Sequence, residues 1–372
     1  IKQSTNMIIG IPKETTDQEL RVGITPSGVA SLMQLGHRVL IEKSAGMGSG
    51  IPDTNYSDKG AEIVSNPNII FSSSDLVVKV KEVQASEWSL LHPGLTTFSF
   101  LSLGSNPALA EALLKNKVTT VAYETIEMDD GSLPILKTMS ALTGRLAVDV
   151  ASHYLKSSQG GSGKLLSGIE GVIPAKVLIL GAGVAGFHAA ELALNMGAQV
   201  TVLSRGRQRL MELRGRLQNN KRLKTDIASH DSISGAVSTA DVVIGAIRDA
   251  GGAVPNLVTR AMVQSMQNGS VIVDACIDQG GCFETSRKTT LTDPIYVDEG
   301  VTHYCVRNMP GSVPRTATET LCNATLPYIQ LIAKDGLISA AKTDNSLALG
   351  INTANGRMVN RSVAEALGLN VS

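Results

Sequence analysis

The chain has 372 residues, of which 43% are apolar and 18% charged, and 33 basic residues balance 33 acidic ones. This length suits about two domains of roughly 100–200 residues each. Zero net charge and 3% aromatic residues argue against the basic face and stacking platforms of a nucleic-acid binder. No apolar run reaches the roughly 18 residues that span a bilayer, and the first ten residues lack the apolar core of a signal peptide. We therefore expect a cytoplasmic protein with no nucleic-acid or membrane partner.

The cysteines lie in the last third of the chain, at Cys276, Cys282, Cys305 and Cys322. They form no C-x-x-C pair, and no histidine cluster has the spacing of zinc ligands. Reduced structural thiols are typical of such a pattern in a cytosolic protein. We expect no metal site.

The first third of the chain alternates short β-rich runs with helical or turn segments. Met7–Ile11 is predicted to be a buried strand, and Thr25 before Pro26 is a typical helix start, with a capping residue before proline. The later runs are HRVLIEK, AEIV, DLVVKVKE, TTFSFLSL and VTTVAYE. This alternation predicts an α/β domain with a mostly parallel sheet.

One long helix is predicted over residues 136–155, because this segment contains no proline. The polar loop after it, SSQGGSGK, resembles a phosphate-binding P-loop. The pattern G-x-x-x-x-G-K-[ST] requires glycine at position 158 and Ser or Thr at position 165. The chain has Ser158 and Leu165, so we reject a P-loop.

The strongest local signal is a glycine fingerprint between two predicted strands. Residues 176–180 (KVLIL) are a buried strand, residues 181–186 (GAGVAG) open a helix, and residues 199–203 (QVTVL) are the next strand. In this context the three glycines permit the tight turn, the approach of the pyrophosphate and close helix packing, while the helix N-terminus meets the phosphates. The expected coenzyme contacts are Gly181, Ala182, Gly183, Val184 and Gly186.

The end of the second strand bears on which coenzyme is bound. An NAD site normally places an acid there for the ribose hydroxyls, which repels the 2′-phosphate of NADP. This chain has Ser204, followed by Arg205 and Arg207. Each arginine can supply charge-assisted bonds to a phosphate, worth roughly 1.5–3 kcal/mol. A solvated basic helix is the alternative interpretation. The pattern favours NADPH, and NAD stays open.

Several further stretches, read together, resemble one family. They are IGIPKE, RVGITP, VVKVKE, AYETI, GSLPIL, MSALTGRLA, IDQGGCFE and NMPGSVPRT. In this order and spacing they resemble alanine dehydrogenase over the whole chain from Met7, and more distantly the NAD(H)-binding subunit of proton-translocating transhydrogenase. The resemblance implies a Rossmann domain, residues 135–309, inserted in a discontinuous α/β substrate domain, residues 1–134 and 310–372. It also implies a homo-oligomer, commonly a hexamer, with a dimer left open.

The same resemblance implies an enzyme that interconverts an amino acid with its 2-oxo acid and ammonia through an imine. Arg21 matches the family's carboxylate-binding arginine, a role that suits a planar guanidinium. Lys81 matches the substrate lysine, with Lys79 as a rival on the same face of a strand. Asp278 matches the catalytic aspartate beside the nicotinamide, with Asp274 as a rival acid.

One position departs from the family. Ser102, in FLSLG, stands where the family has an acid–base histidine. Serine has no pKa near neutrality and cannot alone supply general acid–base catalysis, worth about 10²–10⁴-fold. Three explanations stay open. Asp278 or Lys81, with a water held by Ser102, moves protons for an ordinary 2-oxo acid; the substrate is a preformed imine; or the chain is a coenzyme-binding module without catalysis.

Further coenzyme contacts follow from the matching motifs: Ser140, Gly245, Ala246, Asn308 and Met309. The resulting expectation is an NAD(P)H-dependent oxidoreductase on C–N bonds, with a substrate altered from alanine and pyruvate. A genuine alanine dehydrogenase and a non-catalytic dinucleotide-binding module are the alternatives.

Overall fold

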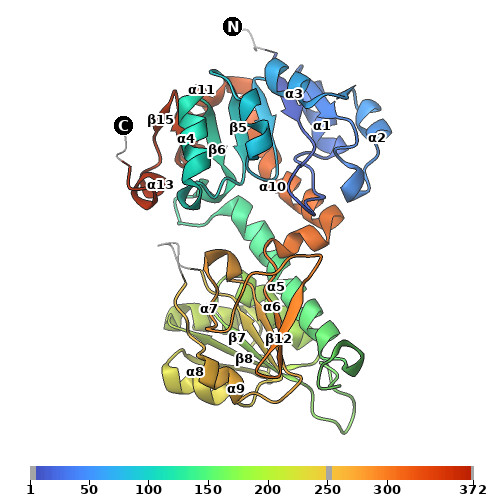
Figure 1. The fold of residues 1–372 in the computed structure, drawn as a ribbon, viewed down its shortest axis with the longest axis vertical. Helices are drawn as coiled ribbons and strands as arrows, with labels where there is room; N and C mark the ends of the chain where they lie inside the picture. Colours follow the sequence, from blue (N-terminus) through green and yellow to red (C-terminus); the bar gives the residue numbers. More distant parts are fainter. Residues whose placement is uncertain (1–5, 249–253, 370–372) are drawn as a thin grey trace. The chain divides into compact units, whose positions relative to one another are not determined.

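The computed structural model describes residues 6–248 and 254–369. The chain forms two compact units, drawn in Figure 1. Unit 1 comprises Ile1–Met139 with Val313–Ser372, and unit 2 comprises Ser140–Ser312. Among the described residues, no helix is long and apolar enough to cross a membrane. The predicted mixed α/β fold is confirmed.

Unit 1 is built on an eight-stranded sheet with the order β15-β14-β6-β5-β4-β1-β2-β3. The six strands from the first third of the chain are parallel, whereas β14 and β15 are antiparallel and join the edge at β6. The final stretch of the chain therefore completes the sheet that the first stretch begins. The strands are β1 Ile8–Ile11, β2 Arg38–Glu42, β3 Glu62–Val64, β4 Leu76–Val78, β5 Thr96–Ser99, β6 Thr119–Ala122, β14 Ile351–Ala354 and β15 Arg357–Met358.

The strands of unit 1 are short apolar runs because both faces of the sheet are covered. On β4, Leu76 and Val78 belong to one hydrophobic cluster with residues of helices α1 (Pro26–Gln34) and α10 (Pro314–Asp335). Val77 belongs to a second cluster with residues of α3 (Pro67–Ser73) and α4 (Pro107–Lys115). Alternate side chains thus serve opposite faces, and each fully buried aliphatic chain contributes about 1.5–3 kcal/mol.

The helices of unit 1 begin where the sequence carries capping residues. Thr25, Asn66 and Asn106 each accept a backbone N–H of the first turn, and proline follows each of them. The helices are α1 Pro26–Gln34, α2 Asp53–Ser57, α3 Pro67–Ser73, α4 Pro107–Lys115, α10 Pro314–Asp335, α11 Leu337–Thr343, α12 Asn345–Gly350 and α13 Arg361–Ala366; α5, Pro134–Tyr154, runs across the boundary between the units.

Unit 2 has a seven-stranded sheet with the order β12-β13-β11-β10-β7-β8-β9. All neighbouring strands are parallel except β12, which is antiparallel at one edge. This is the doubly wound order, with its switch point between β7 and β10. The strands are β7 Lys176–Leu180, β8 Gln199–Ser204, β9 Leu223–Ile227, β10 Val242–Gly245, β11 Val271–Asp274, β12 Ile295–Asp298 and β13 Val301–Tyr304.

The helices that connect these strands are α6 Val184–Asn195, α7 Arg207–Arg216, α8 His230–Val237 and α9 Arg260–Gln264. Helix α6 follows β7 directly and packs on β7 and β8. Its N-terminus therefore lies at the carboxyl edge of the sheet, beside the switch point where such folds bind their ligands.

Candidate active site

The carboxyl edge of the unit 1 sheet brings together charged and polar side chains from successive strands. Glu14 follows β1, Lys79 and Lys81 follow β4, Ser102 follows β5, and Glu124 follows β6. Because these strands are parallel neighbours, their exits meet at one edge. Short 3-10 turns shape two of these exits, η3 at Leu103–Ser105 and η4 at Tyr123–Thr125.

Arg21 lies in the interior of unit 1, with 2% of its surface exposed. Its Nε and Nη2 atoms both lie 2.6 Å from the carboxylate of Glu19, and Nη1 lies 3.4 Å from the Met139 sulfur. Arg21 is therefore not a surface arginine. The bidentate pair with Glu19 holds the guanidinium plane in one orientation, so Glu19 positions Arg21.

The two lysines after β4 have different surroundings. Lys79 is 1% exposed, and its Nζ lies 2.9 Å from Glu87 Oε1 and 3.5 Å from Glu14 Oε2. Burial alone would lower the pKa of Lys79, but the two carboxylates raise it above its ordinary value. Lys81 is only partly buried, and within the described residues its Nζ has no hydrogen-bond or ion-pair partner. Lys79 is thus a structural cation, and Lys81 stays the predicted substrate lysine.

The prediction that both lysines lie on one face of a strand is wrong, because β4 ends at Val78. The Lys79 N–H still donates to the Phe98 carbonyl, 3.0 Å away. The next two N–H groups, of Val80 and Lys81, turn instead to Glu14 Oε1 at 2.6 and 3.4 Å. The role of Glu14 was not predicted from the sequence, although Glu14 belongs to the IPKE motif that follows β1.

The turn after β5 is also held by a carboxylate that accepts backbone N–H groups. Glu124 Oε1 accepts the N–H groups of Leu101 and Ser102 at 3.1 and 2.6 Å. Ser102 has φ +46°, in the left-handed region, and its side chain is exposed. A non-glycine residue costs about 1–2 kcal/mol there, so the bonds to Glu124 stabilise a strained turn. The role of Glu124 was also not predicted from the sequence, although Glu124 belongs to the AYETI motif.

In unit 2 the glycine loop has room for a pyrophosphate. A side chain at Gly181 or at Gly186 would overlap backbone oxygens, of Ala246 and Gly181 respectively, so both positions require glycine. A Cβ at Gly183 would meet no atom within 4 Å. Gly183 caps α6, and Val184 is the first helical residue. The open space before the free N–H groups of this helix fits a dinucleotide phosphate.

Two further predicted coenzyme contacts, Ser140 and Gly245, lie in different surroundings. Ser140 lies on α5 one turn before Gly144, whose Cβ would overlap the Ala185 carbonyl. This places the Ser140 face of α5 toward the start of α6. Gly245 ends β10, where a Cβ would lie 2.5 Å from Cys282 Sγ. Packing alone therefore explains that glycine.

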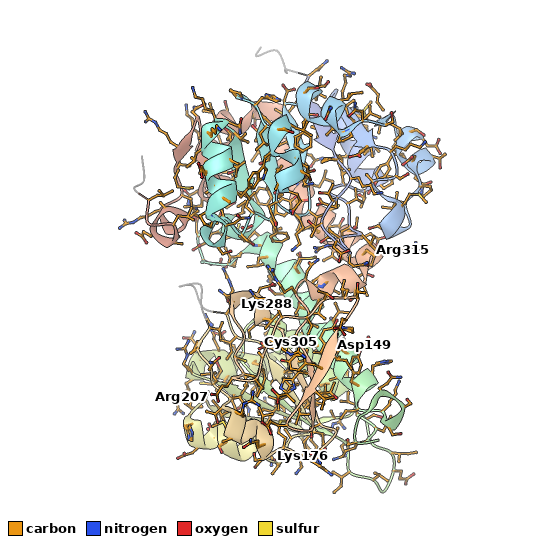
Figure 2. The ribbon with its side chains drawn as sticks, in the orientation of Figure 1. Asp149, Lys176, Arg207, Lys288, Cys305 and Arg315 are labelled. Atoms are coloured by element: carbon orange, nitrogen blue, oxygen red, sulfur yellow. The ribbon has the colours of Figure 1, made fainter. Side chains whose placement is uncertain are left out.

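Ser204 is the last residue of β8, and α7 starts three residues later at Arg207. Arg205 and Arg207 are exposed, and Figure 2 marks Arg207 at the start of α7. No acidic side chain occupies positions 204–207. An anion at this strand end would meet two cations and the positive end of a helix.

The two aspartates around β11 have opposite surroundings. Asp274 is fully buried and accepts hydrogen bonds from the N–H groups of Cys276 and Cys282 and from the Ser286 hydroxyl. Burial raises the pKa of Asp274, and these bonds make it a structural acid. Asp278 is 60% exposed, and its Oδ1 lies 3.1 Å from Nε of Arg307.

The last pair of predicted coenzyme contacts follows Arg307. Asn308 has φ +61°, which asparagine tolerates better than most residues, and Met309 is buried in the 3-10 turn Met309–Ser312.

All four cysteines are free thiols and buried, and Figure 2 marks Cys305 within unit 2. Cys276 and Cys282 lie in different turns of the segment around Asp278. Their sulfurs and a carboxylate oxygen of Asp274 lie within 4.8 Å of one another. Sequence spacing did not predict this grouping. A hydrogen bond with Cys276, together with burial, raises the pKa of Cys282 well above its ordinary value, so this thiol stays protonated and unreactive.

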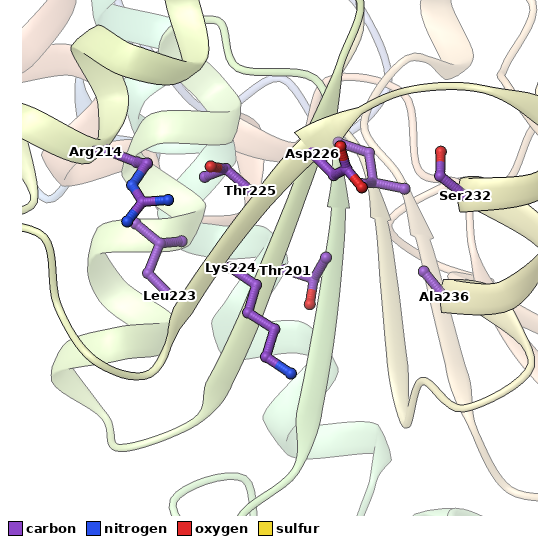
Figure 3. Close-up of a pocket in the computed structure, with 9 residues that line it drawn as sticks. Thr201, Arg214, Leu223, Lys224, Thr225, Asp226, Ser232 and Ala236 are labelled. Atoms are coloured by element: carbon purple, nitrogen blue, oxygen red, sulfur yellow. The ribbon is translucent and has the colours of Figure 1, made fainter.

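A pocket of about 430 Å³ lies elsewhere on unit 2, beside β8 and β9 (Figure 3). It contains none of the predicted coenzyme residues. Its lining residues are Thr201, Leu203, Arg214, Leu223, Lys224, Thr225, Asp226, Ser232 and Ala236.

Comparisons with known proteins match nearly the whole chain. Residues 10–143 match the family model "Alanine dehydrogenase/PNT, N-terminal domain", and residues 147–361 match its C-terminal domain. Alanine dehydrogenase of Halomonas elongata is 45% identical over 363 residues, and that of Staphylococcus haemolyticus is 47% identical over 364; each alignment covers 98% of this chain and 97% of the relative.

Solved structures agree with this match. An L-alanine dehydrogenase superposes with a TM-score of 0.93 at 42% identity, covering 97% of this chain and 99% of that chain. A transhydrogenase from Sinorhizobium meliloti superposes with a TM-score of 0.81 at 25% identity, covering 95% of this chain and 99% of that chain.

Proposed function

We propose that this chain, which belongs to the alanine dehydrogenase/PNT family, reduces a carbon–nitrogen double bond of a small 2-oxo acid imine with NADPH as coenzyme. The predicted family, and with it an oxidoreductase that uses a nicotinamide dinucleotide, is confirmed. The observation that carries the proposal is the 45–47% identity to alanine dehydrogenases along both units. The first substrate pair to consider is therefore pyruvate with ammonium.

The residues of unit 1 have the chemistry that such a substrate requires. Arg21, held by Glu19, presents a fixed cation for a carboxylate. Lys81, whose Nζ has no partner among the described residues, supplies a second cation that polarises the substrate carbonyl. In unit 2, Asp278 supplies an exposed carboxylate after β11. The dinucleotide, when bound, supplies the hydride.

The preference for NADPH is supported by the end of β8. Ser204 removes the acid that would repel a 2′-phosphate, and Arg205 and Arg207 follow within one turn. NADH would gain no contact from these arginines. Ser204→Asp places a carboxylate at the strand end, and we expect it to shift the ratio of kcat/KM for NADPH over NADH by about 10²-fold or more toward NADH. An unchanged ratio would refute the assignment.

A second candidate substrate is a preformed imine, which needs hydride and one proton but no condensation with ammonia. Ser102 favours this reading, because a small exposed side chain at the end of β5 leaves space for a larger group and provides no imidazole. Ser102→His is then expected to reduce turnover of the imine and to raise turnover of pyruvate with ammonium. Improved turnover of the imine would contradict this candidate.

The decisive experiment follows coenzyme oxidation by absorbance, with NADPH and NADH in parallel. Pyruvate with ammonium is tested first, and a cyclic imine carboxylate second. Turnover of the first pair supports reductive amination, and turnover of the cyclic compound alone supports the second candidate. If NADPH binds but neither substrate is reduced, the proposed function is wrong.

A further inference from the structure

The proposed reaction needs a group that gives and takes a proton at the substrate, and Ser102 cannot be that group. Several charged side chains at this edge of unit 1 are already committed to one another. Glu19 pairs with Arg21, while Glu14 and Glu87 share Lys79. Glu124 differs, because within the described residues no cation lies within ion-pair distance of its carboxyl group. Its carboxyl group accepts hydrogen bonds from the backbone of the Ser102 turn and from its own backbone N–H.

The two oxygens of Glu124 are used unequally. Oε1 accepts two N–H groups, from Ser102 at 2.6 Å and from Leu101 at 3.1 Å. Oε2 has one longer contact, 3.3 Å from the Leu101 N–H. A carboxylic acid satisfies this pattern when Oε1 is the carbonyl oxygen and the proton is on Oε2. In that state both backbone bonds persist and Oε2–H can donate to another group.

Glu124 also has a rigid support. Its neighbour Tyr123 is fully buried, and the Tyr123 ring contacts Phe98 and Phe100 edge-on at 4.5 and 5.1 Å between centroids. The Tyr123 hydroxyl donates to the Lys79 carbonyl at 2.9 Å. Side chains of β5 and the exit of β4 therefore fix the turn that carries Glu124.

The charges around Glu124 favour proton uptake. Burial raises the pKa of its carboxyl group above the ordinary value, the backbone N–H groups oppose this, and the charge of Glu82 adds to the increase. Glu82 and Lys81 lie on the segment after β4. Helix α12, which contacts η4, contains no titratable side chain. Helices α4 and α13 contact η3, and they carry Glu111 and Lys115, and Arg361 and Glu365, respectively.

We propose that Glu124 is the proton-holding group of the substrate site and that the same carboxyl group positions the Ser102 turn. This inference rests on the proposed function for its chemistry. Ammonium transfers a proton to the Glu124 carboxylate and becomes ammonia, which adds to the substrate carbonyl carbon. The adduct then moves one proton from its ammonium nitrogen to the former carbonyl oxygen, which gives a neutral carbinolamine. The Glu124 carboxylic acid protonates the carbinolamine hydroxyl, the C–O bond breaks, and water leaves. Bound NADPH would supply the hydride that reduces the resulting iminium carbon. The amine takes its last proton from solvent. A preformed imine takes one proton from the same acid.

The test compares Glu124→Gln with Glu127→Gln, a matched loss of one carboxyl three residues further along at an exposed position. Glutamine keeps an oxygen that accepts both backbone bonds, so the turn is retained. We expect Glu124→Gln to lower kcat by about 10²-fold or more, to leave KM within a few-fold, and to remove one limb of the kcat–pH profile. Glu127→Gln should leave kcat and the profile unchanged.

Wild-type kcat and an intact pH profile in Glu124→Gln would overturn the proposal, as would a reduced kcat with both limbs retained, which indicates positioning alone. A second readout does not depend on turnover. In protein with ¹³C-labelled glutamate carboxyls and NADP⁺ bound, the difference between wild type and Glu124→Gln isolates the Glu124 resonance. Titration clearly above the ordinary glutamate value supports the proposal even if no substrate is reduced. Titration at the ordinary glutamate value, near pH 4.3, overturns it.

Discussion

Replacing Lys79 with methionine would leave Glu14 and Glu87 in the interior of unit 1 without the ammonium group they share. All three side chains are at most 7% exposed, and the ammonium lies 3.5 and 2.9 Å from the two carboxylates. Methionine has nearly the length of lysine, so the substitution removes the charge with little loss of volume. The remaining carboxylates must then be protonated or stay unpaired in a dry environment.

The expected cost follows from this geometry. Removing one partner of a buried ion pair destabilises a protein by about 3–5 kcal/mol, because the other charge is left uncompensated. For a unit of about 200 residues, 1 kcal/mol shifts the melting temperature by about 2–4 °C. Lys79→Met should therefore lower the Tm of unit 1 by about 6–20 °C at neutral pH. Burial raises the pKa of the Glu14 carboxyl group, so the loss should shrink at lower pH as Glu14 becomes protonated.

The control is Lys81→Met, two residues along the chain. Lys81 Nζ has no hydrogen-bond or ion-pair partner among the described residues. Removing this ammonium group should therefore change the Tm by no more than about 1–2 °C while greatly reducing kcat/KM. Thermal unfolding followed by circular dichroism, with the coenzyme oxidation assay on the same samples, measures both properties. A Tm of Lys79→Met equal to that of the wild type, or a lower Tm for Lys81→Met than for Lys79→Met, would contradict this prediction.

Three further outcomes are expected. Arg21→Lys cannot reproduce the bidentate bonds to Glu19, so KM for the 2-oxo acid should rise at least 10-fold in steady-state assays; an unchanged KM would contradict carboxylate binding by Arg21. Because burial raises the pKa of Asp274, the folded state binds this proton more tightly than the unfolded chain. Stability from this group therefore falls as pH rises from the ordinary aspartate value through the raised pKa, and urea titrations should show a flatter pH dependence in Asp274→Asn. Gly186→Ala places a Cβ on the Gly181 carbonyl and should weaken NADPH binding at least 10-fold by fluorescence titration; normal affinity would refute the packing argument.

Local patterns were sufficient to predict much of the secondary structure. The strand β1, the capped start of α1 at Thr25, the long helix α5 and the strand–glycine loop–helix order at Gly181–Gly186 all appear where the sequence indicates them. These features depend on short-range physics, namely apolar runs, caps and the positive φ that glycine permits. The motif resemblance adds Arg21, Lys81 and Asp278, whose catalytic roles stay predictions.

The difference between Lys79 and Lys81 could not be predicted from the sequence. In VVKVKE the two lysines are two residues apart, as are neighbours on one face of a strand. Glu14, some 66 residues earlier, accepts the N–H groups of Val80 and Lys81, so the strand does not continue through these residues. One lysine is thereby buried between two acids and the other is not. The same holds for Glu124, which reaches the Ser102 turn only because β5 and β6 are neighbours in the sheet. Sequence spacing determines which residues share an element, whereas burial and the pairing of charges depend on distant segments that only the folded sheet brings together.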